Sequence, residues 1–129
     1  MDLTQTHYAQ LGGEAAVLQL ATRFYEIMDT IPEAWELRKL HPQDLIISRD
    51  KLFKFLSGWL GGPPLYVQEY GHPMLRARHL PFPINMQMRD QWLLCMDQAL
   101  AEQVSDIQLK QALQFAFRQT ADHMRNQAG

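Results

Sequence analysis

Residues 45–84 read LIISRDKLFKFLSGWLGGPPLYVQEYGHPMLRARHLPFPI, and this stretch decides what kind of fold the chain can adopt. Its first part, residues 45–60, carries apolar side chains at helical spacing, and the Gly-Gly-Pro-Pro run at 61–64 ends that helix. Residues 65–84 contain Gly71, Pro73, Pro81 and Pro83, so only short helical turns fit there. A loop of about 20 residues is unusual inside a compact domain and is often functional.

Helical spacing also continues on both sides of this stretch. No run of alternating residues is long enough to predict a strand, and there is no internal repeat. Pro32 suits the first turn of a helix, Asn85 is a candidate N-cap, and residues 105–108 form a capping box that begins with Ser105. We therefore predict an all-α fold with helices over 14–30, 33–40, 45–60, 85–103 and 109–124, and with a short helix before Gly12.

The composition predicts one globular domain over residues 1–129. Hydrophobic residues make up 47% of the chain, and the net charge of −2 gives no reason to expect nucleic acid or an anionic membrane as partner. Cys95 is the single cysteine, so no intramolecular disulfide forms, which suits a reducing cytoplasm. The first ten residues have neither the basic nor the apolar part of a signal peptide, and no apolar run is long enough to span a membrane.

Few residues fit a known chemical motif. The familiar zinc, calcium and phosphate-binding patterns are missing from the sequence, and Cys95 is predicted to be a buried, inert thiol. Among five histidines, His79 stands out because it leaves a short helical turn and enters the apolar stretch Leu80-Pro81-Phe82. On spacing alone, His79 is either a ligand or a core or surface histidine. A buried Tyr25 hydroxyl and Trp92 indole would each need a hydrogen-bond partner, which with a ligand histidine suggests an oxygen or haem pocket.

Several short motifs together resemble one family over almost the whole chain. The group II truncated haemoglobins, small globins with a two-over-two helical sandwich, share this combination. The matching text is Leu11-Gly12-Gly13, Arg23-Phe24-Tyr25, His41-Pro42, residues 55–63, Tyr66, residues 71–76, Arg78-His79, Pro81-Phe82 and residues 89–93.

The resemblance implies that His79 is the proximal histidine, the axial ligand of the iron in haem b. A neutral imidazole nitrogen binds the iron, and the other ring N–H needs an acceptor that fixes the orientation of the ring. We expect a backbone carbonyl of the preceding turn to be that acceptor. The resemblance also implies contacts from Phe55 to the haem and from Arg78, Lys51, Tyr66 and His72 to its propionates.

The resemblance places Tyr25, Trp92 and His41 on the distal side, with Ser48 and Leu52 on the helix that crosses above the haem. Haem-bound O2 carries negative charge, so each donor aimed at it contributes about 1.5–3 kcal/mol. Three donors therefore predict slow O2 release. His41 stands where the family often has tyrosine or phenylalanine, and it either donates to the ligand, binds the iron as a sixth ligand, or only caps its helix. We favour the role of His41 as a donor. Tyr25 is a weaker candidate than His41 for the sixth ligand of the iron.

The implied function is the binding of O2 and of related ligands, namely NO, CO, H2O2 and sulfide. Enzymatic extensions are NO dioxygenation and peroxidase-type chemistry, which need electrons from an external reductase. Alternatives are a haem-based redox or gas sensor, a six-coordinate electron-transfer globin, and a helical interaction protein without haem. The sequence leaves open whether the protein is a monomer or a homodimer.

Overall fold

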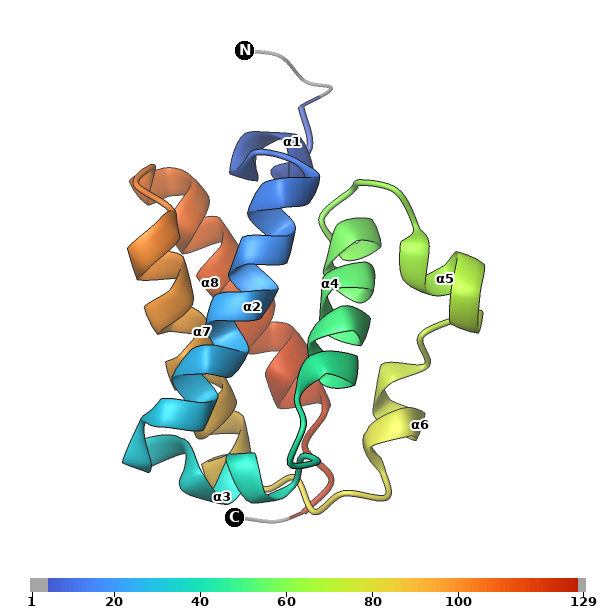
Figure 1. Ribbon diagram of the computed structural model, residues 1–129, viewed down its shortest axis with the longest axis vertical. Coiled ribbons are helices and arrows are strands. Elements are labelled where there is room, and N and C mark those ends of the chain that lie inside the picture. Colours follow the sequence, from blue (N-terminus) through green and yellow to red (C-terminus); the bar gives the residue numbers. More distant parts are fainter. Residues whose placement is uncertain (1–4, 128–129) are drawn as a thin grey trace.

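The fold is built from helices and connecting segments, as the sequence predicts. Figure 1 shows the computed structural model, which describes residues 5–127, and none of these residues lies in a strand. The elements are α1 (His7–Leu11), α2 (Glu14–Thr30), the 3-10 helix η1 (Pro32–Ala34), α3 (Trp35–Lys39), α4 (Ile46–Trp59), α5 (Leu65–Tyr70), α6 (Leu75–His79), α7 (Met86–Gln103) and α8 (Ile107–His123).

The four long helices form two antiparallel pairs. Helices α2 and α4 make one pair and α7 and α8 make the other, and α2 packs against both α4 and α7. This is the two-over-two arrangement that the resemblance implies. The core between the pairs consists of fully buried apolar side chains, which include Leu20, Phe24, Leu56, Met96, Leu100 and Leu113.

The predicted helix limits agree closely with the observed ones, and one cap differs. Asn85 caps α7, because its side chain accepts a hydrogen bond from Met88 N. The capping box that we predicted with Ser105 is wrong. Asp106 is the N-cap of α8, and its carboxylate accepts from the amides of Gln108 and Leu109 at 3.0 and 3.2 Å. A carboxylate satisfies two free amides there and is favoured by the positive end of the helix dipole.

The Gly-Gly pair after α4 does more than end that helix. Gly61 has a φ of 97°, and a Cβ there would lie 2.9 Å from Thr6 Cβ. A Cβ at Gly62 would overlap the Tyr8 ring. The amide of Tyr8 also donates to the carbonyl of Leu60 at 2.9 Å. Two adjacent glycines therefore allow α1 to close against the end of α4.

Segment 65–84 departs from regular helical packing. It forms two short helices, α5 and α6, neither of which contains a buried residue. Helix α5 packs on α4, and Figure 1 shows α6 set apart from α4, near the level of its lower end. Over the described part of the chain, no helix has both the length and the apolar character needed to cross a membrane.

Candidate functional site

His79 is the last residue of α6 and is half-buried. Its Nδ1 lies 2.6 Å from the carbonyl oxygen of Leu75, one turn earlier. Because a carbonyl oxygen only accepts, Nδ1 carries the proton and Nε2 is left with a free lone pair. The imidazole is therefore in the tautomer that binds a metal through Nε2, with its orientation fixed by the preceding turn.

Three polar rings from separate elements form a cluster around the fully buried Phe24. The Phe24 ring centroid lies 4.9 Å from that of Tyr25 and 5.0 Å from that of Trp92. The His41 ring lies 5.7 Å from the Tyr25 ring. The structure therefore brings together Tyr25 of α2, Trp92 of α7 and His41 after α3. The helical spacing within each element does not predict that these residues meet.

His41 is held in the same way as His79. Its Nδ1 lies 3.0 Å from the carbonyl oxygen of Leu37, so Nε2 again carries the free lone pair. Burial lowers the pKa of His41, the charges of Arg38 and His79 lower it further, and the bond to Leu37 opposes this shift.

The other two polar groups of the cluster are available to a ligand. Among residues 5–127, no hydrogen bond uses the Tyr25 hydroxyl or the Trp92 indole N–H. Burial raises the pKa of the Tyr25 hydroxyl, which keeps it protonated and able to donate. Two donors and one acceptor nitrogen therefore gather in one cluster.

Helix α4 supplies the surface between this cluster and α6. Ser48, Leu52 and Phe55 share one face of α4; Ser48 is half-buried, and Leu52 and Phe55 pack against the core. A cavity of about 770 Å³ opens between α4, α6 and α8. It is mostly apolar and is lined by Phe55 and Trp59, by residues 73–77 just before His79, and by residues 119, 120, 123 and 124 of the α8 end. The cluster of Tyr25, Trp92 and His41 is not part of its lining.

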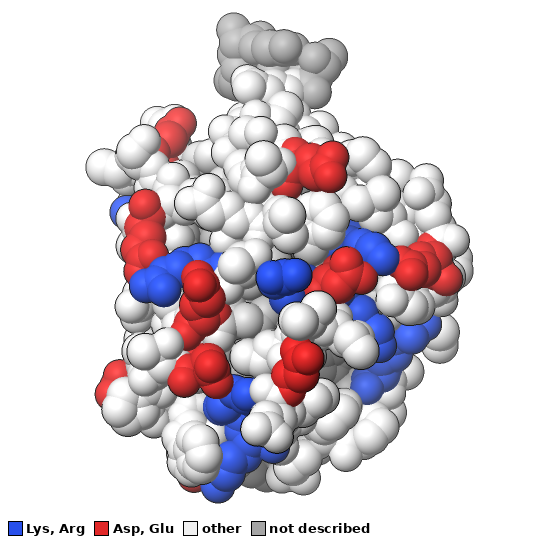
Figure 2. Space-filling model, viewed as in Figure 1, with Lys and Arg blue, Asp and Glu red and all other residues white. Residues whose placement is uncertain are grey.

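Basic and aromatic side chains surround the outer edge of this region. The Arg78 guanidinium lies 5.5 Å from the Tyr66 ring centroid, and Lys51 Nζ lies 5.4 Å from that of Tyr70. Figure 2 shows a group of basic side chains on the face over α4 and α6. Arg78 also donates to the carbonyls of Tyr70 and His72, both at 3.3 Å. The His72 side chain is exposed, so its contact within this group is through the backbone. The propionate contacts stay predictions.

Two residues that hold the site in place are not evident from the sequence. Gln91 Oε1 accepts from the amide of Leu37 at 2.8 Å, which fixes the turn that carries His41 against α7. Its only sequence signal is its position next to Trp92. Asn126 follows α8 and donates to the carbonyl of His79 at 3.2 Å. Its place in a short polar tail gave no signal at all.

The residues present fit a haem. Within the described ranges, no three His, Cys, Asp or Glu side chains come together as a site for a bare metal ion. An iron held by the single imidazole of His79 therefore needs its other ligands from elsewhere, and a porphyrin supplies four. An apolar cavity lies beside the helix that carries His79, although His79 itself is not in its lining, and the basic edge at Lys51 and Arg78 suits the carboxylates of the macrocycle.

Known proteins are similar to this chain in both sequence and fold. The family model described as bacterial-like globin matches residues 6–126. The group 2 truncated haemoglobin YjbI of Bacillus subtilis is 44% identical over 115 residues, which are 89% of this chain and 85% of that protein.

Solved structures also match the fold of this chain. The group II 2-on-2 haemoglobin of Agrobacterium tumefaciens has a TM-score of 0.94 at 45% identity and covers 100% of both chains. The cold-adapted truncated haemoglobin of Pseudoalteromonas haloplanktis TAC125 has a TM-score of 0.93 at 50% identity and covers 95% of this chain and 98% of its own. The chain therefore belongs to the bacterial-like globins, among the group 2 truncated haemoglobins, and haem b is the cofactor on which it binds its ligands.

Proposed function

We propose that this globin binds O2 with slow release, because Tyr25 and Trp92 donate hydrogen bonds to the bound ligand. The observation that carries the proposal is that neither donor has a protein partner among residues 5–127, although Tyr25 is buried enough for the pKa of its hydroxyl to be raised. Haem, when bound, supplies the ferrous iron on which diatomic gases bind. The protein then contributes His79 on one side and the two donors on the other.

The hydrogen bonds of this pair determine how long the ligand stays. A hydrogen bond from a free donor to a charged acceptor contributes about 1.5–3 kcal/mol. Each donor therefore slows ligand loss by about 10- to 100-fold. Slow release suits a protein that holds O2 for a reaction better than one that carries it.

His41 has a different chemical part in this proposal. Its Nδ1–H is used by the carbonyl of Leu37, so Nε2 accepts a proton and does not donate one while the imidazole is neutral. The lowered pKa of His41 favours the neutral form. We infer that donation from His41 to O2 requires acidic conditions and that at neutral pH its Nε2 is a base or a sixth ligand to the iron.

The base at His41 supports a second candidate function, peroxidase-type use of H2O2. H2O2 must lose a proton as it binds, and a neutral imidazole with a free Nε2 takes up that proton. NO dioxygenation, in which O2 and NO give nitrate, needs no such base and relies on the donors Tyr25 and Trp92. Repeated NO dioxygenation takes its electrons from an external reductase, since the sequence contains no flavin or nicotinamide motif, and the peroxidase reaction takes its electrons from a reducing substrate such as a phenol.

The test begins with absorption spectra of the purified protein with hemin, ferric and then ferrous, with and without O2. A Soret band that responds to O2, followed by slow O2 displacement by CO, supports the proposal. Fast displacement contradicts it. Absence of a Soret band after hemin addition contradicts haem binding itself.

The two reactions are then separated on the same protein. Mixing NO with the oxygenated protein gives stoichiometric nitrate if the protein is a dioxygenase. Turnover of a phenolic reductant with H2O2, and its loss in His41→Phe, supports the peroxidase candidate. Ligand binding without either reaction favours scavenging or sensing.

A further inference from the structure

Helix α6 carries the proximal histidine but is not anchored by burial. It has five residues, none of them buried, and its N-cap residue Met74 has a left-handed φ of 46° without a side-chain cap. Hydrophobic packing normally fixes a helix of this size, since isolated short helices are unstable in water. Other contacts must therefore decide where His79 lies.

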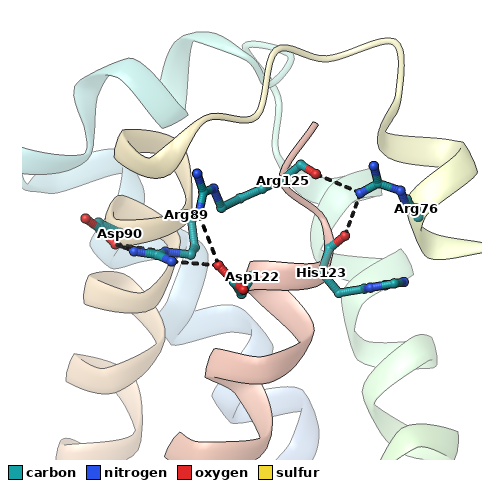
Figure 3. A network of polar contacts seen from close by, with 6 residues as sticks. All are labelled: Arg76, Arg89, Asp90, Asp122, His123 and Arg125. Carbon is teal, nitrogen blue, oxygen red and sulfur yellow. Dashed lines mark hydrogen bonds and ion pairs between the residues drawn. The ribbon is translucent and has the colours of Figure 1, made fainter. Parts of the chain in front are cut away.

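Those contacts come from the segment that follows α8. Arg76 Nη1 donates to the carbonyls of His123 and Arg125 at 2.9 and 2.7 Å, which ties the middle of α6 to the end of α8 (Figure 3). The end of α8 is itself tied to α7, because Arg89 Nη1 donates to Asp122 at 2.6 Å. Helix α6 is thus connected to the core through a chain of polar contacts.

Asn126 makes the contact nearest to the ligand. Its Nδ2 donates to the carbonyl of His79 at 3.2 Å and to that of Phe82 at 2.9 Å. Its Oδ1 accepts from Ile84 N at 3.0 Å, and its own amide donates to Ile84 O at 2.9 Å. One side chain therefore satisfies three backbone groups of the 79–84 turn. Ile84 is buried, so this end of the turn is fixed to the core.

We propose that Asn126 is a positioning residue for the proximal histidine, and that it sets the orientation of the His79 imidazole toward the haem iron. The inference rests on the proposed haem site. The Leu75 carbonyl fixes the ring relative to its own helix, and Asn126 fixes the end of that helix relative to the core. Together the two contacts would determine the direction in which Nε2 points. Outer groups that orient a metal ligand typically change metal affinity by about 10- to 100-fold when removed.

The test compares Asn126→Ala and Asn126→Asp with Gln127→Ala in the full chain with haem. Asn126→Asp keeps the oxygen that accepts from Ile84 N but replaces the amide donor to the His79 carbonyl by an acceptor. Gln127→Ala is the control, because Gln127 contacts Ile84 through its backbone amide and its side chain is exposed. The first readout is the iron–histidine stretching band of the ferrous protein in resonance Raman spectra. The second is the rate of hemin transfer to an apoglobin acceptor.

We expect both Asn126 variants to shift or broaden the iron–histidine band and to lose hemin about 10- to 100-fold faster, while Gln127→Ala matches wild type. A role in stability alone would lower the unfolding midpoint and leave the band of the folded protein unchanged, and that result would overturn the proposal.

Hydrogen exchange of the Ile84 amide in the apoprotein checks the bond directly: Asn126→Ala should lose protection and Asn126→Asp should retain it. If wild-type protein binds no haem, both the proposed function and this inference fail. If it binds haem through His79 and Asn126 variants behave like wild type, only the inference fails.

Discussion

Replacing Tyr25 by Phe should speed O2 release, because the substitution removes one hydroxyl and leaves the ring in place. The hydroxyl has no protein partner among residues 5–127, so no competing bond in the protein weakens its bond to the ligand. A hydrogen bond to a charged acceptor is worth about 1.5–3 kcal/mol. The O2 dissociation rate of Tyr25→Phe should therefore rise by roughly 10- to 100-fold.

Trp92→Phe should have an effect of similar size for the same reason. The two substitutions are not expected to be additive, since both rings contact Phe24, at 4.9 and 5.0 Å between centroids. Once one donor is lost, the ligand reorients toward the other. The double variant, which has no donor left to compensate, should therefore release O2 faster than the product of the two single effects predicts.

The assay is stopped-flow displacement of O2 by excess CO, followed at the Soret band. Tyr8→Phe is the matched control, because it removes a tyrosine hydroxyl from α1, which packs against the Gly61-Gly62 turn at the C-terminal end of α4. Its O2 dissociation rate should equal that of wild type. A Tyr25→Phe rate within twofold of wild type would refute the assignment of Tyr25 as a donor, whatever the haem content of the variant.

Three further predictions concern the rest of the site and the fold. Above pH 6.5, the ordinary pKa of histidine, the His41 imidazole stays neutral, so the O2 dissociation rate should not depend on pH there. As the pH falls through the lowered pKa of His41, its Nε2 gains a proton and donates to the ligand, which should slow O2 release. A scan from about pH 8 to about pH 5 checks this, and His41→Phe should show a flat profile. His79→Ala should lose tight haem retention in a hemin-transfer assay; an unchanged spectrum and retention would disprove the axial role. Gly62→Ala should destabilise the apoprotein by about 1–3 kcal/mol in urea unfolding, because the new Cβ overlaps the Tyr8 ring, and Tyr8→Ala should relieve most of that loss.

Local patterns predicted the helices well, because each long helix buries a single face. Val17, Leu20, Phe24 and Ile27 recur at helical spacing and are all buried, and the predicted helix over 14–30 is the observed α2. The N-cap of α8 was misplaced by one residue because Ser105 and Asp106 both fit the preference for a cap. Only the structure shows which oxygen reaches the free amides.

Local sequence patterns predict much less of the site than of the helices. Spacing left His79 undecided between a ligand and an ordinary histidine, and only the resemblance placed it opposite Tyr25 and Trp92. The reason is physical: these residues come from α6, α2 and α7, and a helical period within one element says nothing of the crossing of α2 and α7 at Phe24 that brings Tyr25 and Trp92 together. Asn126 lies after the last helix, where no period applies, and its role depends wholly on the turn that folds against it.

The two sides of the site are built on different principles, and this predicts how they respond to change. Tyr25 and Trp92 stand on long helices whose inner faces are buried, so their positions are fixed by packing and tolerate the loss of a polar contact. His79 stands on a helix without buried residues, so its position depends on the hydrogen bonds of Arg76 and Asn126. Substitutions on the distal side should therefore change ligand release and leave hemin retention intact. Substitutions in the segment after α8 should loosen the haem first, because the bonds they remove hold His79, the proposed metal ligand, and not the proposed donors to the bound gas.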